Sequence, residues 1–237
     1  MNLFKKILYF DLLDSTNDHL INLHKNFGIS IPLVVVADKQ VKGKGQIGKK
    51  WFSDIGSLTF SFSINVTNLI SEWHLSMITS LAIVRVLDNI GVKTSIKYPN
   101  DIIVNNQKIS GILTEVISIN SHKYCIVGVG LNVNNLLFPQ DIPYAVSINN
   151  LVNKNFEKNQ ILKDILLSVE SIFLAKNVTS LYMSSLYGTR KHVLCNYNNS
   201  KTYVKILSIT KKGFLTILMR DQSIITVSHA DIQFLIE

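Results

Sequence analysis

Cysteine is scarce in this chain of 237 residues, which contains two, Cys125 and Cys195. Neither belongs to a Cys-x-x-Cys pair, and no histidines follow at the spacing of a zinc site. The sequence therefore indicates neither a zinc site nor a disulfide framework. Isolated thiols are typical of a reducing compartment, and we expect a cytoplasmic protein.

Long apolar runs are lacking as well. The densest are residues 31–37 and 124–133, far shorter than the ~20 residues that a membrane-spanning helix needs. The N-terminal segment MNLFKKILYFDLL is apolar, but Asp11 and Asp14 interrupt this stretch and no small-residue cleavage site follows. We therefore predict a first β-strand here, no signal peptide and no membrane partner.

Charged residues make up 17% of the chain and apolar residues 47%, enough to bury a core. Acidic residues are the scarcer kind, so the formal net charge is +8. Such a charge would suit a nucleic acid, a nucleotide or a negatively charged protein surface. Because lysine, asparagine and isoleucine are abundant together, biased codon usage explains the excess equally well.

Hydrophobic periodicity predicts a mixed α+β chain. The expected elements are an N-terminal strand, a helix ending before Gly28, strands at 31–37 and 57–66, a helix at 72–90, three strands at 95–104 (interrupted), 109–119 and 124–133, and helices at 157–176 and 181–186. After Gly188, five short segments of strand-like pattern follow: HVLCNY, TYVKILSI, GFLTILM, SIITVS and DIQFLI. They suggest a small barrel and a domain boundary near Leu186.

The segment from Gly43 to Gly48 fits G-x-G-x-x-G, a pattern in which missing side chains let backbone N–H groups approach an anion. A dinucleotide fold needs a helix after this loop, whereas a strand is predicted here. A P-loop needs Ser or Thr after Gly-Lys, and this chain has Lys50. No HRD or DFG segment of a protein kinase follows. An anion-binding loop and a plain hairpin connection both remain open.

Two further segments are rich in polar groups and glycine. KYPND, residues 97–101, sets a cation and a carboxylate around a proline, and KISGIL follows with Lys108 and Gly111. GVGLN, residues 128–132, is a strand whose glycines would admit a ligand, another backbone or a closely packed strand.

Taken together, these segments resemble the biotin protein ligases. DSTN, QxxGxGxxGxxW, KxPND, KxxGIL and GxGxN occur in the family's order and cover most of residues 8–135. The resemblance implies a class II aminoacyl-tRNA synthetase-like mixed sheet flanked by helices, residues 1–186, and a small SH3-like β-barrel, residues 187–237. Some members carry a DNA-binding helix-turn-helix at the N-terminus, for which no room remains before Phe4, so we expect a short form with no specific DNA target.

The resemblance assigns roles to residues that match these motifs. Biotin would be bound by Ser15, Thr16, Asn17, Gln40, Gly43, Lys44, Gly45, Gln46, Lys108, Gly111 and Gly130. ATP would be bound by Lys44, Trp51, Lys97, Asn100, Lys108 and Asn132. The catalytic set would be Lys44, Lys97, Lys108 and Asp101, with no protein ligand assigned to a metal.

The implied reaction uses ATP to convert biotin into biotinyl-5′-AMP and then transfers biotin to a lysine. The expected acceptor is a biotin carboxyl carrier protein or domain of acetyl-CoA carboxylase or a related carboxylase. A biotin carboxylate must approach the α-phosphate, another anion, and the three catalytic lysines and Mg²⁺ would offset the repulsion. Asp101 would orient or deprotonate the acceptor lysine. Monomer and homodimer both remain open.

Two loop positions depart from the family pattern, which commonly has arginine at both. Lys44 keeps the charge but loses the bidentate fork, and Gln46 loses the charge, so we expect looser retention of the acyl-adenylate. Tyr98 stands where tryptophan is usual, an exchange of one aromatic residue for another.

Two alternative functions stay open. A lipoate or octanoate ligase or transferase shares the fold and the acceptor lysine, although GxGxxGxxW and KxPND favour biotin. A non-catalytic nucleic-acid-binding module on a decayed ligase scaffold would use the basic C-terminal region. The intact lysine set argues against decay.

Overall fold

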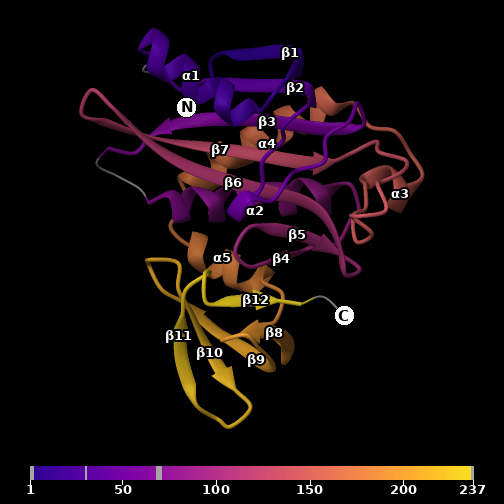
Figure 1. Ribbon diagram of the computed structural model, residues 1–237, viewed down its shortest axis with the longest axis vertical. Helices are drawn as coiled ribbons and strands as arrows, with labels where there is room; N and C mark the ends of the chain where they lie inside the picture. Colours follow the sequence, from indigo (N-terminus) through magenta and orange to yellow (C-terminus); the bar gives the residue numbers. More distant parts are fainter. Residues whose placement is uncertain (1–2, 30, 68–70, 236–237) are drawn as a thin grey trace.

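A seven-stranded mixed sheet forms the larger part of the protein, in the order β1-β2-β3-β7-β6-β5-β4 (Figure 1). The structure, a computed structural model, describes residues 3–29, 31–67 and 71–235. The strands are β1 (Ile7–Leu13), β2 (Val34–Gln40), β3 (Ser57–Asn65), β4 (Ser95–Lys97), β5 (Asp101–Val104), β6 (Gln107–Ile119) and β7 (His122–Asn132). Neighbours β1 and β2 are parallel and the other neighbouring pairs are antiparallel, so the predicted mixed sheet is confirmed.

Helices cover both faces of this sheet (Figure 1). Successive residues of β2 point to opposite faces of the sheet and are buried on both. Val34 and Val36 belong to the core under α2, whereas Val35 belongs to a second core under α1. A strand buried on both sides reads as a continuous apolar run, as this one does. The helices are α1 (Thr16–Phe27), α2 (Glu72–Asn89), α3 (Ile148–Val152), α4 (Lys158–Phe173) and α5 (Val178–Ser185).

Helix α1 starts and stops where its capping residues predict. The Ser15 side chain accepts a hydrogen bond from the Asp18 backbone N–H at 3.4 Å, which caps the first turn. Gly28 ends the helix with φ 58°, a left-handed conformation that glycine adopts without strain. The DSTN segment thus forms the turn between β1 and α1 and the first residues of the helix.

Two strand predictions need correction. The strand predicted from residue 31 begins at Val34, whose N–H donates to the Lys6 carbonyl at 3.0 Å; Pro32 has no N–H for such a ladder. The interrupted strand predicted at 95–104 is two antiparallel strands, with Ile96 opposite Ile102, because the chain reverses between them.

A second sheet of five antiparallel strands follows, in the order β11-β10-β9-β8-β12 (Figure 1). Its strands are β8 (Val193–Tyr197), β9 (Ser200–Ile209), β10 (Leu215–Met219), β11 (Ile224–Val227) and β12 (Ile232–Phe234). The five predicted segments are thus strands, although Ile236 of the last lies outside the described residues. In the part of the chain that the structure describes, β11 and β12 are not paired, so no closed barrel is seen. We keep the division at residues 186 and 187, between α5 and β8, as a proposal.

The second sheet packs against the KYPND turn. The Tyr98 hydroxyl donates to the Gly213 carbonyl at 2.8 Å, and burial raises the pKa of Tyr98, so this group remains a donor. The Tyr98 ring meets Phe234 edge-on at 6.4 Å, and Trp73 lies against Gly213, where a Cβ would be 2.5 Å from the indole. These contacts set the C-terminal strands beside residues 97–101.

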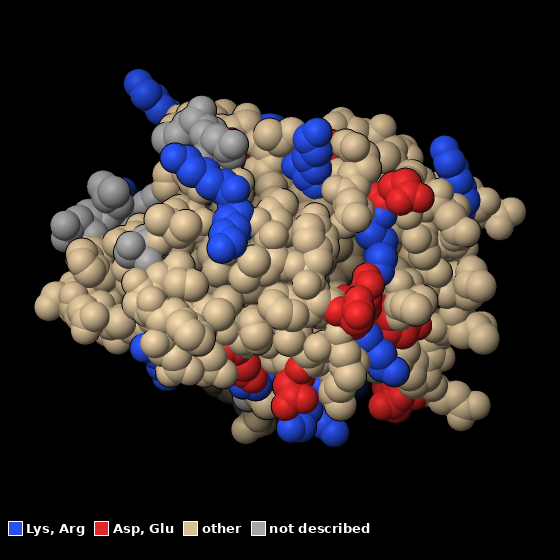
Figure 2. Space-filling view, turned by 90° about the horizontal axis from the view of Figure 1, so that it is seen from above, with Lys and Arg blue, Asp and Glu red and all other residues tan. Residues whose placement is uncertain are grey.

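Lysine and arginine side chains do not cluster on the face of the protein above β1 and α1. Figure 2 shows lysine and arginine side chains there separated by uncharged residues and interspersed with acidic ones. This face offers no continuous basic track of the kind that binds a nucleic-acid backbone. Among the described helices, none combines the length and the apolar character needed to cross a membrane.

A buried histidine predicts a pH-dependent stability. His24 in α1 is 1% exposed and its ring centroid lies 4.6 Å from that of Tyr124. Burial lowers the pKa of His24 below its ordinary 6.5, partly offset by the Ile29 backbone. As the pH falls below 6.5 the unfolded chain binds the proton first, so the free energy of unfolding should be highest above 6.5 and decline below it.

Thermal melting between about pH 7.5 and 5 would measure that decline. His24→Phe keeps the ring contact with Tyr124 and should flatten the curve. Some slope should remain from His74, whose pKa burial also lowers. An identical decline in the His24→Phe variant would contradict the assignment to His24.

Candidate active site

A cavity of about 640 Å³ lies where the glycine loop, the β1–α1 turn, the KYPND turn and the C-terminal sheet meet. Most of the predicted site residues line it: Ser15, Thr16, Asn17, Gln40, Lys44, Gly45, Gln46, Trp51, Lys97, Asn100, Asp101, Lys108, Gly111 and Gly130. The two others, Gly43 and Asn132, do not line it. Segments far apart in the sequence thus form one site.

One end of this cavity is polar and built from buried, uncharged groups. The backbone N–H and the hydroxyl of Thr16 both point to Gln40 Oε1, at 2.7 and 3.0 Å. This pairing fixes the Gln40 amide with its Nε2 donor side turned away from Thr16. Ser15, Thr16 and Asn17 are each 3% exposed. The arrangement suits a ligand group that carries donors and acceptors but no charge.

Glycines on β6 and β7 line the cavity and leave room for side chains of other segments. A Cβ on Gly128 would overlap the Asn17 amide, and a Cβ on Gly130 would overlap the Trp51 indole. A Cβ on Gly111 would come within 3.2 Å of the same indole. The sequence left open which group lies against the glycines of GVGLN. In the structure these groups are the side chains of Asn17 and Trp51.

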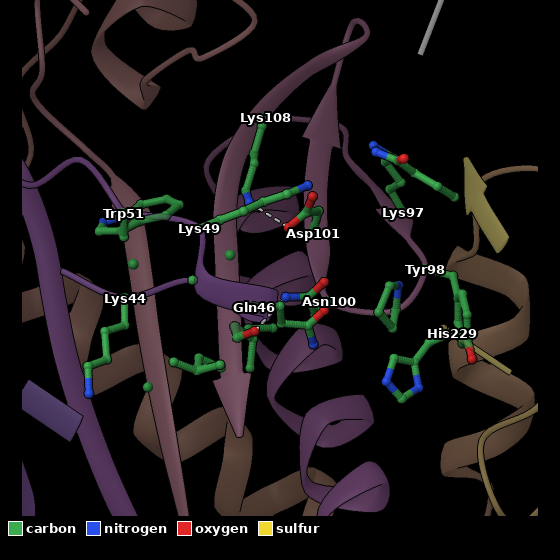
Figure 3. Close-up of a pocket in the computed structure, with 18 of the residues that line it drawn as sticks. Lys44, Gln46, Lys49, Trp51, Lys97, Tyr98, Asn100, Asp101, Lys108 and His229 are labelled. Carbon is green, nitrogen blue, oxygen red and sulfur yellow. Dashed lines mark hydrogen bonds and ion pairs between the residues drawn. The ribbon is translucent and has the colours of Figure 1, made fainter. Parts of the chain in front are cut away.

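Cations gather around one carboxylate at the centre. Lys108 Nζ lies 2.6 Å from Asp101 Oδ1 and 5.4 Å from the centroid of the Trp51 ring. Burial lowers the pKa of Lys97; Asp101 opposes this effect, while the charges of Lys108 and Lys49 add to it. Figure 3 shows Lys49 and Lys108 extending toward Asp101. Three lysines thus surround the Asp101 carboxylate in this part of the cavity. A bound anion would reduce the repulsion between their ammonium groups.

Lys49 was not among the predicted site residues. Its signal was present in Gly48-Lys49-Lys50, a sequence that served above only to exclude a P-loop. Lys49 and Lys50 both line the cavity.

Lys44 lies apart from this centre. Its Nζ pairs with Asp18 Oδ1 at 2.6 Å, and this hydrogen bond raises the pKa of Lys44. In Figure 3 the Lys44 side chain points away from Lys97 and Lys108. The structure therefore brings two of the three predicted catalytic lysines to Asp101 and holds the third at α1.

A second cavity of about 260 Å³ lies on the other side of Trp51. Trp51, Lys50 and Lys108 line both cavities, and the remaining walls of the smaller one are Phe52, Asn132, Phe138, Asp141, Ile142, Pro143, Tyr144 and Ala145. Asn132 donates to the Val146 carbonyl at 3.0 Å and so holds the loop after β7. Aromatic walls with a few polar groups suit a flat heterocycle.

The C-terminal sheet supplies a wall of the larger cavity that the sequence did not reveal. Its residues there include Asn196, Asn199, His229, Asp231 and Gln233. His229 lies at the tip of a turn in which the Ser228 N–H and hydroxyl donate to Asp231 Oδ2 at 2.8 and 2.6 Å, and Figure 3 places it beside Tyr98. These residues form no motif and reach the site through tertiary packing.

The cavity places lysines beside a neutral polar pocket, an arrangement that could hold an anionic group next to an uncharged ring. The sequence profile of the Biotin/lipoate A/B protein ligase family matches residues 9–132. The bifunctional ligase/repressor BirA of Bacillus subtilis is 30% identical over 243 residues, which cover 96% of this chain and 73% of that protein. The chain belongs to the biotin/lipoate A/B protein ligase family.

Solved structures agree with this assignment. The biotin protein ligase of Aquifex aeolicus in complex with biotin and ATP superposes with a TM-score of 0.83 at 26% identity, covering 99% of this chain and 100% of that one. The Helicobacter pylori biotin acetyl coenzyme A carboxylase synthetase, at 22% identity and TM-score 0.68, covers 93% of this chain and 99% of its own and shares the fold. The predicted ligase fold is therefore confirmed.

Proposed function

We propose that this ligase converts biotin and ATP into biotinyl-5′-AMP and then transfers the biotinyl group to a lysine of a carboxyl carrier protein or domain. The main support is one cavity that joins a buried, neutral polar end to a centre containing Lys97, Lys108 and Asp101. The Aquifex aeolicus ligase, similar over its whole length, binds biotin and ATP. The acceptor would be acetyl-CoA carboxylase or a related carboxylase in the cytoplasm.

In the first step a biotin carboxylate oxygen attacks the α-phosphorus of ATP, and the bond to the β-phosphate oxygen breaks. Pyrophosphate leaves with that electron pair. Lys97 and Lys108 would stabilise the negative charge that accumulates between the two anions. The lowered pKa of Lys97 agrees with this role, because a bound anion would favour the charged form that burial and the neighbouring lysines disfavour.

The two cavities would divide the substrates at Trp51. Biotin's ureido ring would occupy the polar end near Ser15 and Gln40, with its carboxylate toward Lys108. The adenine ring would enter the smaller, aromatic cavity that Trp51 and Asn132 line. Lys108 lines both cavities, which suits a residue between the reacting carboxylate and phosphate.

Mg²⁺ is expected to accompany ATP, and the cavity contains carboxylates that could bind it. This ion usually takes one or two carboxylates and fills its other positions with phosphate oxygens and water. Asp101 and Asp231 line the cavity and could supply such ligands. Within the described ranges no group of three or more potential ligands forms a protein cage, and none is needed for this mode of binding. When bound, the ion would neutralise phosphate charge.

In the second step the neutral amine of the acceptor lysine attacks the carbonyl carbon of the mixed anhydride. The carbon–oxygen bond to AMP breaks, AMP leaves as an anion, and the nitrogen loses a proton. Asp101 is the carboxylate within the lysine cluster, and we assign it the orientation of the incoming amine.

Pyrophosphate exchange into ATP tests the first step. The reaction is run separately with biotin, lipoate and octanoate, and biotin alone should support exchange. Exchange driven by lipoate or octanoate would assign the chain to the other branch of its family. Salt-sensitive RNA binding without exchange would instead favour the non-catalytic reading.

A further inference from the structure

Two residues outside every predicted motif control the polar end of the cavity. Ser61 is fully buried on β3, and Glu115 is half-buried on β6. Neither lines the cavity. Both contact Asn17, which does.

The hydroxyl of Ser61 holds the carbonyl oxygen of the Asn17 amide from behind the cavity wall. Ser61 Oγ lies 2.6 Å from Asn17 Oδ1 and 2.7 Å from Thr16 Oγ1. A hydroxyl carries one proton, and the Asn17 carbonyl oxygen can only accept. Ser61 therefore donates to Asn17. It can accept from Thr16 only when the Thr16 hydroxyl does not donate to Gln40, whose oxygen the Thr16 backbone N–H holds in either case.

Glu115 fixes the same amide from its other side. Asn17 Nδ2 donates to Glu115 Oε2 at 2.6 Å, and a carboxylate offers no proton with which to pair the flipped amide. A flip of Asn17 would set its carbonyl oxygen against the Glu115 carboxylate and lose that hydrogen bond, so Glu115 fixes the orientation and Ser61 adds a donor to it. The orientation is thus set by groups that a ligand cannot displace from within the cavity.

Because the Gln40 and Asn17 amides are fixed, this end of the cavity presents a defined pattern of hydrogen-bond donors and acceptors. Gln40 presents its donor side, because its oxygen is held by Thr16, and the Asn17 carbonyl keeps a second lone pair. A cyclic urea has both N–H donors and a carbonyl acceptor, whereas a dithiolane or an alkyl chain has neither and would leave buried polar groups unpaired.

We infer that Ser61 and Glu115 are positioning residues that hold Asn17 for recognition of a cyclic urea and so determine the specificity of the acyl substrate. The inference rests on the proposed function. Loss of either residue should weaken biotin binding without changing the handling of ATP.

Ser61→Ala tests this inference, with Ser63→Ala as a matched control. Ser63 is also fully buried, two residues along the same face of β3, but its hydroxyl accepts from the Leu33 N–H at 3.3 Å and has no part in the cavity. Pyrophosphate exchange should show KM for biotin about fivefold to tenfold higher in Ser61→Ala. Its kcat and KM for ATP should stay at the wild-type values, as should every kinetic constant of Ser63→Ala.

Glu115→Gln keeps the size of the side chain but can donate as well as accept, so Asn17 is free to flip, and KM for biotin should rise again. This variant serves if Ser61→Ala does not fold. Equal KM for biotin in wild type, Ser61→Ala and Glu115→Gln would overturn the inference, as would a parallel rise in KM for ATP. If the wild-type protein shows no biotin-dependent pyrophosphate exchange, the proposed function itself is wrong.

Discussion

Lys108→Ala should lower kcat for biotin-dependent pyrophosphate exchange at least about 100-fold, the usual cost of removing one preorganised group that stabilises transition-state charge. Lys108 lies 2.6 Å from Asp101 and lines both cavities, so its ammonium group is the cation best placed between carboxylate and phosphate. Stability should change little, because the Lys108 side chain is 37% exposed.

Lys42→Ala is the matched control. Lys42 also forms an ion pair, with Asp14 at 2.8 Å, but both partners are well exposed and Lys42 does not line the cavity. Its removal should leave kcat and both KM values unchanged. Similar exchange rates in the Lys42→Ala and Lys108→Ala proteins would contradict the role assigned to the central lysines.

Gly130→Ala should raise KM for ATP roughly 30-fold, which corresponds to about 2 kcal/mol of overpacking. The added methyl group would occupy the space of the Trp51 indole, so the wall between the two cavities must move. Thermal melting of the variant should also report a lower free energy of unfolding. Trp51→Ala in the Gly130→Ala background should restore that stability but not the affinity for ATP.

Gly128→Ala provides the contrast on the same strand. Its methyl group would overlap the Asn17 amide instead, so KM for biotin should rise while KM for ATP changes little. If both glycine variants affect the same substrate, the proposed division of biotin and nucleotide at Trp51 is wrong.

The sequence predicted the elements well where local chemistry is strong. Gly28 ends α1 as predicted, and Ser15 caps its start. Asn105 and Asn106 form the turn between β5 and β6 with φ 46° and 62°, a left-handed pair that asparagine tolerates. The strand-to-strand position of the glycine loop, which excluded a dinucleotide fold, is also confirmed. Strand ends were less predictable because they depend on a partner strand.

The candidate site was predictable only in part. Charged and glycine-rich motifs pointed to Lys97, Lys108 and the glycines of β7, and the cavity contains them. Ser61 gave no signal, because a serine in an apolar strand looks the same whether it bonds to a backbone group or orients a neighbouring amide. His229 gave none because its proximity to the site depends on how the second sheet packs.

By itself, the sequence determined most of the helices and strands, and which short motifs carry charge or lack side chains, because capping, periodicity and backbone freedom act over a few neighbouring residues. The tertiary structure alone decided that Lys108 faces Asp101 while Lys44 pairs with Asp18, and that C-terminal residues complete the cavity. Such pairings depend on burial and distance between segments far apart in the chain, which the local order of residues does not contain.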